Sequence, residues 1–329
     1  MKNRIEYIDL AKGFCILLVV LNHVTEFLNM DYPFSDQIRS FRMPLYFILS
    51  GLFFKRYENF LGFAKRKTNK LLIPFLFFLI MTSLLPSIIV HKFVFSINYF
   101  INCGPMYNYP IWFLLCLFET NILFYVIFLI SEHITSKHAN SLAMTMTILF
   151  GIVGLFLSLF KIRIPLYIDT ACTVLPFFSF GWWLNHHTNF LRNPFNLKNN
   201  TILLIVCTII LLLLAAPVDY STNFISPKAF FTAHICGVSG TLLVLLIAKY
   251  FRHSPLISFW GRYSIMILCS HVLFITLFGK ITKYFNLPII PSFLLVFILT
   301  MTICHILIPV MKRYLPYVTA QKDLIKIES

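Results

Sequence analysis

Charged side chains are scarce in this sequence. Asp, Glu, Lys and Arg make up only 12% of its 329 residues, whereas hydrophobic residues make up 59%. Soluble globular domains carry roughly 25% charged residues, so this composition excludes a water-soluble protein. The apolar residues form runs of about 20, the length with which a helix crosses a bilayer and satisfies its own backbone polar groups. The sequence therefore predicts an all-α polytopic membrane protein.

The sequence also lacks close cysteine pairs, internal repeats and long loops. Its eight cysteines are scattered as single residues, most of them inside apolar runs, as Cys15 and Cys116 are. This spacing argues against a disulfide framework and against a metal site, so we expect no metal. No loop has room for a second folded domain, so we expect residues 1–329 to form a single membrane domain. Residues 14–28 lack a following small-residue cleavage site, which predicts a retained first span rather than a signal peptide.

Hydropathy and flanking charge predict about ten transmembrane helices. They lie near residues 12–30, 43–54, 70–90, 111–130, 142–160, 171–185, 201–216, 230–248, 259–279 and 288–311. The second span is short for a full crossing. A tilted or partly re-entrant segment is therefore an alternative at that position.

The basic residues predict how these spans are oriented. A formal net charge of +15 would indicate nucleic acid binding in a soluble domain, but here the basic residues form short clusters between apolar segments, so we expect no nucleic acid partner. With the N-terminus in the cytoplasm, the five outer loops hold eight basic residues: Arg39, Arg42, Lys92, Lys161, Arg163, Lys228, Lys280 and Lys283. The remaining 19 of the 27 lie inside, including a cluster in residues 55–70. Both termini are therefore predicted to be cytoplasmic.

The first span carries ionisable residues along one face. At about 100° per residue, Lys12, His23 and Glu26 fall within an arc of about 60°, and His23 lies about 16 Å beyond Lys12. Ionisable side chains inside a bilayer cost at least a few kcal/mol and usually face a cavity or a partner. This pattern favours a functional polar face. The alternatives are that Lys12 only anchors the helix at the interface and that His23 only bonds a neighbouring helix.

The ninth span has a similar pattern. Ser264 and His271 are seven residues apart and share a helix face, with His271 about ten residues past the cytoplasmic flank. Because the first and ninth spans run in the same direction, His23 and His271 should lie at comparable depth. Two histidines at matched depth favour a shared cavity, with structural roles as the alternative.

Two further spans hold candidate ligand-binding residues. Arg42, at the outer mouth of the second span, is suited to an anionic or hydroxyl-rich ligand, with an interfacial anchor as an equal alternative. In the same span we expect Pro44 in the first helical turn and expect Ser50-Gly51 to let another backbone approach closely. Glu119 lies about two turns inside the fourth span and is a candidate cavity residue.

Four segments of the sequence occur in the same order as the characteristic segments of a known family. They are Tyr7-Ile8-Asp9-Leu10-Ala11-Lys12-Gly13 followed by His23, residues 41–54 with Pro44 and Ser50-Gly51, Ile111-Trp112-Phe113-Leu114, and residues 264–271. In this order they resemble the integral-membrane acyltransferase-3 family, which includes O-acetyl- and O-succinyltransferases of bacterial surface polysaccharides. Lys12 stands where the family usually has Arg, a form similar to the fucose 4-O-acetylase branch. Arg42 stands where that branch commonly has His.

The resemblance implies an O-acyltransferase in a bacterial cytoplasmic membrane. It would move an acetyl group, or alternatively a succinyl group, from acyl-CoA to a hydroxyl of a cell-surface or lipid-linked saccharide, with acetyl-CoA as the expected co-substrate. His23 fits the base, Glu26 would orient it, and Lys12 would hold the phosphates of CoA. His271 would join the catalytic residues. The expected substrate-binding residues are Arg42, Glu119 and Ser264.

Two other classes of protein remain as alternatives. A transporter or flippase of glycan or lipid-linked sugar would also place charged residues inside the membrane. The paired Gly- or Pro-broken spans that mark many transporter sites are not found in two matching halves of this sequence. A relative that only scaffolds a polysaccharide synthase is the third reading. The sequence leaves open whether the acyl group moves directly or through a covalent relay, and whether the chain forms a homo-oligomer.

Overall fold

The computed structural model describes residues 5–57, 59–90, 108–191, 193 and 195–326, and most of this part is helical. Helices lie at every one of the ten predicted spans. They are α1 (Glu6–Leu28), α2 (Ser35–Leu52), α4 (Ile73–Val90), α6 (Trp112–Ile134), α7 (Ala139–Leu159), α8 (Ile168–His187), α9 (Leu197–Leu214), α10 (Ala233–Phe251), α12 (Ser264–Tyr284) and α13 (Ile289–Tyr314).

Short elements connect the long helices. They are α3 (Phe60–Lys67), the π-helical turn η1 (Thr68–Leu72), α11 (Pro255–Arg262), the 3₁₀ turns η2 (Tyr109–Ile111), η3 (Pro165–Tyr167) and η4 (Pro227–Ala229), and the strands β1 (Val218–Asp219) and β2 (Phe224–Ile225). The two strands pair antiparallel between α9 and α10, with Val218 opposite Ile225. This hairpin reaches the candidate site described below.

Within the described residues, six helical segments are long and apolar enough to cross a membrane. They are Glu6–Leu28, Tyr109–Ile134, Ala139–Leu159, Ala233–Phe251, Ser264–Tyr284 and Ile289–Tyr314. The chain is thus an all-α polytopic membrane protein, as the composition predicts. The count of ten spans and the cytoplasmic position of both termini remain predictions. Four of the basic residues used for the orientation, Lys2, Arg4, Lys92 and Arg192, lie outside the described residues.

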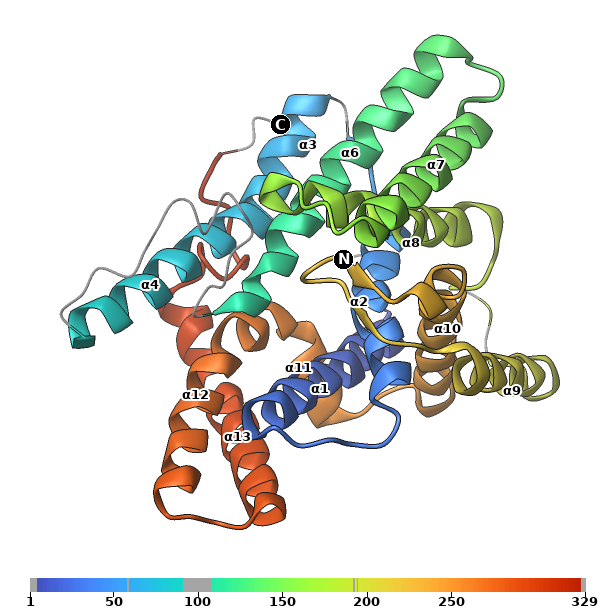
Figure 1. Ribbon diagram of the computed structural model, residues 1–329. Helices are drawn as coiled ribbons and strands as arrows, with labels where there is room; N and C mark the ends of the chain where they lie inside the picture. Colours follow the sequence, from blue (N-terminus) through green and yellow to red (C-terminus); the bar gives the residue numbers. More distant parts are fainter. Residues whose placement is uncertain (1–4, 58, 91–107, 192, 194, 327–329) are drawn as a thin grey trace.

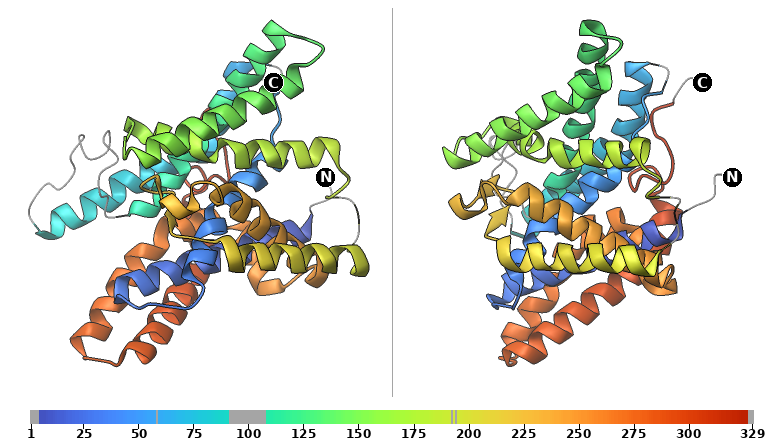
Figure 2. Two further views of the ribbon diagram at one scale, coloured as in Figure 1. Left: turned by 45° about the vertical axis from the view of Figure 1, so that its right-hand side comes forward. Right: turned by 90° about the vertical axis from the view of Figure 1, so that its right-hand side faces the viewer.

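The helices pack around α1 and α2. Helices α12 and α13 lie side by side on one side of α1 (Figure 1). Helix α8 packs against α2, and α7 and α6 pack against α8. Helix α10 packs against α2, and α9 covers α10 as an outer layer (Figure 2). The centre of the molecule is therefore bounded by α1, α2, α6 and α12, and the candidate site lies between them.

Reciprocal glycine contacts bring two pairs of helices together. A Cβ at Gly261 of α11 would lie 1.8 Å from the carbonyl oxygen of Asp9, and one at Gly13 of α1 would lie 2.0 Å from that of Ile257. Helices α2 and α8 meet in the same way, since a Cβ at Gly51 would lie 1.9 Å from the Phe178 carbonyl oxygen. No side chain fits at these distances, so the expected close approach at Ser50-Gly51 is confirmed.

The prediction that Pro44 lies in the first turn of its helix is wrong. Helix α2 begins nine residues earlier, at Ser35, and is continuous to Leu52. A proline inside a helix leaves the carbonyl four residues earlier without its usual donor. Here that carbonyl belongs to Ser40, and the hydroxyl of Tyr220 from the hairpin region lies 3.5 Å from its oxygen as donor. A long-range contact thus compensates for the proline, and the predicted short span is a full helix of 18 residues.

The predicted ninth span is broken in two. Helix α11 ends at Arg262 and α12 begins at Ser264, with Tyr263 between them at φ −113° and ψ 26°. The break places the amino-terminal turn of α12 inside the molecule. There the N–H groups of Met266 and Ile267 donate to the Tyr263 carbonyl at 2.9 and 3.4 Å, and the positive end of the helix dipole lies at this turn.

Candidate active site

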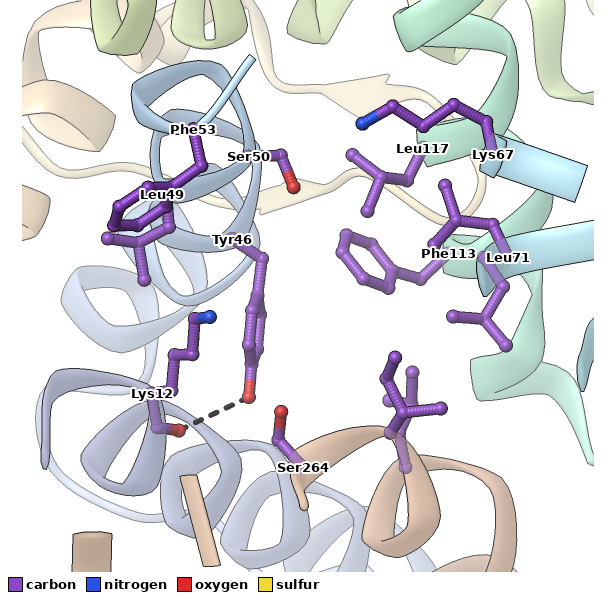
Figure 3. Close-up of a pocket in the computed structure, with 13 residues that line it drawn as sticks. Lys12, Tyr46, Leu49, Ser50, Phe53, Lys67, Leu71, Phe113, Leu117 and Ser264 are labelled. Carbon is purple, nitrogen blue, oxygen red and sulfur yellow. Dashed lines mark hydrogen bonds between the residues drawn. The ribbon is translucent and has the colours of Figure 1, made fainter. Parts of the chain in front are cut away.

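A cavity with two lysines lies between α1, α2, α6 and α12. Its volume is about 220 Å³, and we call it the lysine cavity. It is lined by Lys12, Tyr46, Leu49, Ser50, Phe53, Lys67, Leu71, Phe113, Leu114, Leu117, Ser264, Ile265 and Leu268. Figure 3 shows Lys12 and Lys67 on opposite sides of this space, with Tyr46 and Ser264 at its base.

The two lysines come from different parts of the chain. The backbone of Lys12 is fixed by α1, where its carbonyl accepts a hydrogen bond of 3.2 Å from the Tyr46 hydroxyl, and its ammonium nitrogen lies 5.9 Å from the centre of the Phe53 ring. Lys67 ends α3, with its ammonium nitrogen 5.4 Å from the centre of the Phe63 ring. Burial lowers the pKa of Lys67 to about 8. The lysine cavity is therefore a mainly apolar space with two cationic groups at its wall, an arrangement suited to an anionic ligand with an apolar arm.

Ser264 lies at the start of α12, on the same wall as Tyr46. Its side chain is 9% exposed and lines the lysine cavity together with Ile265. Because α12 begins here, the positive end of its dipole lies at the cavity. The predicted substrate-binding residue Ser264 thus faces the cavity that Lys12 faces.

A second cavity lies beyond Leu268 and contains His23. Its volume is about 120 Å³, and we call it the histidine cavity. It is lined by Val19, His23, Glu26, Arg39, Arg42, Met43, Tyr109, Pro110, Trp112, Val218, Asp219, Tyr220, Ser221 and Leu268. An adjoining space of about 230 Å³, lined in part by His23, Glu26, Tyr109 and Thr276, reaches the other side of the same residues.

His23 belongs to a hydrogen-bonded group with Glu26 and Tyr109. Its Nδ1 lies 3.1 Å from Glu26 Oε2, and the Tyr109 hydroxyl donates to that same oxygen at 2.8 Å while also contacting His23 Nδ1. A carboxylate only accepts hydrogen bonds, so this network favours the tautomer in which Nδ1 carries the proton. The Nε2 of His23 then has a free lone pair. This is the arrangement that a general base needs.

Glu26 is itself held by further polar residues. Asn22, fully buried one turn earlier in α1, donates to Glu26 Oε1 at 2.6 Å, and the guanidinium of Arg39 lies 3.5 Å from the same oxygen. The oxygen of the Asn22 amide accepts from Arg39 Nε at 3.2 Å and from the Tyr32 hydroxyl at 3.0 Å. The orientation of His23 is therefore fixed by a network from three parts of the chain.

His271 contacts His23 but lines neither of the two named cavities. The two rings stack with centroids 5.2 Å apart at an angle of 29°. His271 is fully buried, its Nδ1 donates to the Ile267 carbonyl at 2.9 Å, and its Nε2 has no hydrogen-bond partner within the part of the chain that the structure describes. The structure thus brings the two histidines together at one depth, with only His23 exposed to the histidine cavity.

Arg42 lies in the wall of the histidine cavity. Its Nε and Nη1 atoms are buried and have no hydrogen-bond partner among the described residues. Across the cavity, Asp219 accepts hydrogen bonds from the Ser221 backbone N–H at 2.9 Å and from the Ser221 hydroxyl at 2.7 Å. A ligand with several hydroxyl groups would find both donors and acceptors here.

Glu119 is not part of either cavity. It lies on a different face of α6, near Asp169 of α8, and its Oε2 is buried with no hydrogen-bond partner among the residues described. Asp169 is fully buried 3.2 Å from Arg163. The structure therefore separates Glu119 from the other predicted site residues.

The histidine cavity contains polar residues that are absent from the site predicted from the sequence. Tyr109 and Asp219 lie in connections between helices, and Arg39 lies in the first turns of α2. Tyr109 and Arg39 bond residues of α1, and the strand that contains Asp219 packs against α2. The polar connection around Asp219, Tyr220 and Ser221 between two apolar spans was the available sequence signal.

One residue connects the two cavities. Leu268 of α12 lines both, is 4% exposed and lies between Ser264 and His271 on one helix face. On α1, Lys12 and His23 occupy the two cavities in the same order. The site therefore consists of a cationic and a histidine-containing compartment on either side of a leucine, inside a helical membrane protein.

Comparison with known families identifies the class of this protein. The family model described as an acyltransferase domain, of the acyltransferase-3 family, matches residues 5–308. The chain belongs to this family and is a membrane acyltransferase. No curated protein and no solved structure gives a significant match.

Proposed function

We propose that this enzyme moves an acetyl or succinyl group from acyl-CoA to a hydroxyl of a cell-surface or lipid-linked saccharide, in the cytoplasmic membrane of a bacterium. The observation that carries the proposal is the pair of cavities that share Leu268. One has the charge that a phosphate-bearing donor needs, and the other has the base that a hydroxyl acceptor needs.

The lysine cavity is the proposed site of the donor. Acyl-CoA combines anionic phosphates with a long arm that ends in a thioester. Lys12 and Lys67 supply two positive charges, and the apolar wall accepts the arm. The thioester would end near Ser264 and Leu268, where the first N–H groups of α12 can stabilise a negatively charged oxygen.

The histidine cavity is the proposed site of the saccharide. Arg39, Arg42 and Asp219 offer donors and acceptors for sugar hydroxyls, and His23 lies in the same wall. In the orientation predicted from the basic residues, this cavity opens toward the outer side and the lysine cavity toward the cytoplasm, where CoA is made.

The reaction uses His23 as the base. Its Nε2 takes the proton of the sugar hydroxyl while the hydroxyl oxygen attacks the carbonyl carbon of the thioester. The new C–O bond forms, the C–S bond breaks, and the proton held by His23 passes to the sulfur, so that CoA leaves as a thiol. Glu26 and Tyr109 stabilise the positively charged ring during this transfer, because both contact its Nδ1.

Turnover of labelled acetyl-CoA tests this proposal. Purified protein in lipid vesicles is incubated with acetyl-CoA labelled in the acetyl group and with bacterial glycans, and both free CoA and labelled glycan are measured. We expect the two products in equal amounts, and neither with His23→Ala. Asn121→Ala is a matched control, because this fully buried residue bonds only its own helix and lines neither cavity.

A transporter or scaffold would give a different result. Movement of glycan without release of CoA would support a transporter, and no change in either substrate would support a scaffold. Either outcome would contradict the proposal.

A further inference from the structure

The carboxy-terminal tail crosses the cytoplasmic segment that carries Lys67. After α13 ends at Tyr314, the chain folds back to η1, the π-helical turn that follows α3. Residues 309–326 lie beyond the part of the chain that the family model matches. The tail therefore lies outside the matched family domain and contacts Asn69 and Lys70 inside it.

Asn69 makes the main contact with the tail. It is fully buried in η1, its Oδ1 accepts hydrogen bonds from the backbone N–H groups of Leu324 at 2.9 Å and Ile325 at 2.8 Å, and its Nδ2 donates to the Ile325 carbonyl at 2.9 Å. One side chain thus binds three backbone groups of the tail. This reproduces the pairing that a neighbouring strand would give, and it fixes the tail at one place on η1.

A second contact lies one residue further along. The ammonium group of Lys70 donates to the Ala320 carbonyl at 3.0 Å and lies 3.0 Å from Asp323 Oδ1. The tail is therefore held both by Asn69 and by Lys70. An exposed ion pair of this kind contributes little by itself, so Asn69 is the stronger of the two contacts.

The side of η1 opposite the tail faces the lysine cavity. Lys67 and Leu71 both line that cavity, and Asn69 lies midway between them in sequence. At about 80–100° per residue, positions four apart share a face and the position between them points the other way. The tail therefore contacts the side of the turn that faces away from the cavity, and Lys67 and Leu71 lie on the side that faces it. Single π-helical turns occur often at functional sites. The contacts of Asn69 with the tail hold η1 in this geometry.

We propose that Asn69 and residues 316–326 form a strap that positions Lys67 and Leu71 for the acyl-CoA donor. The inference rests on the proposed function, because it assigns the donor to the lysine cavity. Asn69 is a positioning residue here, since it touches the tail and not the cavity. Without the strap, η1 would lose three hydrogen bonds, and Lys67 would no longer be held across the cavity from Lys12.

The test separates donor binding from turnover. Three variants are compared with wild type: Asn69→Ala, Asp323→Asn, and a deletion of residues 316–329. For each, the KM for acetyl-CoA, kcat and the Kd for CoA alone are measured in vesicles. For Asn69→Ala and the deletion we expect KM and Kd to rise about tenfold, as for the loss of a well-formed charged contact, with kcat changed less than about twofold. Asp323→Asn, which removes only the exposed ion pair, should change them less than about threefold.

Hydrogen exchange provides a readout that does not depend on activity. In the deletion variant, the backbone N–H groups of residues 68–72 should exchange faster than in wild type, while those of α12 should be unchanged. Asn121→Ala again serves as the matched control, because it removes a fully buried amide that bonds only within α6. Its KM should stay at the wild-type value. Combining Asn69→Ala with Lys67→Ala should raise KM no further than Lys67→Ala does alone, since both changes act through Lys67.

Three results would contradict the proposal that the strap positions Lys67 and Leu71. They are unchanged exchange in residues 68–72 after the deletion, a fall in kcat with KM and Kd unchanged, and additive effects in the double variant. Failure of the proposed function is distinguishable from these. If wild type binds CoA but transfers no acyl group, the function is wrong, whereas the Kd and exchange measurements still decide whether the strap positions Lys67.

Discussion

The two cavities of this enzyme are built differently. In the histidine cavity, His23, Glu26 and Tyr109 are joined by short hydrogen bonds, and Asn22 and Arg39 fix Glu26 in turn. In the lysine cavity, Lys12 and Lys67 lie against aromatic rings in a wall that is otherwise mostly apolar. Chemistry needs atoms held in a fixed geometry, whereas binding of a flexible anionic donor needs charge and space. The difference predicts that substitutions in one cavity change kcat and those in the other change KM.

The largest effect is expected from His23. His23→Ala should lower kcat by roughly 10² or more, the usual contribution of a positioned base, with the Kd for CoA nearly unchanged. Glu26→Gln should lower kcat less, because it weakens the orientation of the ring without removing the base. His271→Ala should lower kcat too, and less than additively with His23→Ala if the stacked rings act as a unit. Single-turnover and steady-state rates in vesicles measure this, and wild-type kcat in His23→Ala would refute the assignment.

The next effect concerns Leu268, the residue between the cavities. Leu268→Ala should raise the rate with butyryl-CoA relative to acetyl-CoA by about tenfold or more, because each methylene in a tight passage is worth roughly 1–3 kcal/mol. Leu268→Phe should slow transfer while leaving CoA binding intact. Leu117→Ala is the matched control, since Leu117 is similarly buried and lines only the lysine cavity. An equal change of preference in Leu117→Ala would show that Leu268 is not the boundary.

Lys12 should affect the donor and not the chemistry. Lys12→Arg keeps the positive charge and should keep most activity, whereas Lys12→Ala should raise the KM for acetyl-CoA by roughly tenfold, the value of one charge-assisted contact. Initial rates at several acetyl-CoA concentrations measure this. Equal loss in the two variants would indicate a role specific to lysine, and no loss in Lys12→Ala would leave Lys12 as an interfacial anchor.

Lys67 predicts a pH dependence of donor binding. Because burial lowers its pKa to about 8, Lys67 is protonated below that pH and loses its charge above it. The KM for acetyl-CoA should therefore rise by up to about tenfold between pH 7 and 9, as the charged fraction falls. Lys12 and Tyr46 are the other titratable groups that line the cavity. In Lys67→Arg, which stays charged throughout, this rise should disappear, and a rise of the same size there would assign it to another group.

The two regions also differ in how far the sequence predicts them. The face formed by Lys12, His23 and Glu26 follows from the period of one helix, and the structure places all three along the two cavities. The depth match of His23 and His271 follows in the same way and is seen as ring stacking. Such features are local, so a single helix determines them.

Other features depend on tertiary contacts and were missed. Helix α6 is apolar around most of its circumference, so its sequence does not show which face Glu119 takes, and that residue lies away from the site. Pro44 lies inside a helix, and the carbonyl that it leaves without a donor faces Tyr220, 176 positions later in the chain. Tyr109 and Asp219 join the histidine cavity from connections whose paths no periodicity gives.

The sidedness of the reaction tests whether donor and acceptor meet at Leu268 from opposite faces of the membrane. Vesicles are prepared with the loop of residues 55–70 facing either outward or inward, as established by protease cleavage at that loop. Labelled acetyl-CoA is then added outside and the glycan is enclosed, or the reverse. We expect labelled glycan only when acetyl-CoA is on the side of residues 55–70 and the glycan is on the other side. Transfer that requires both substrates on one side would contradict it.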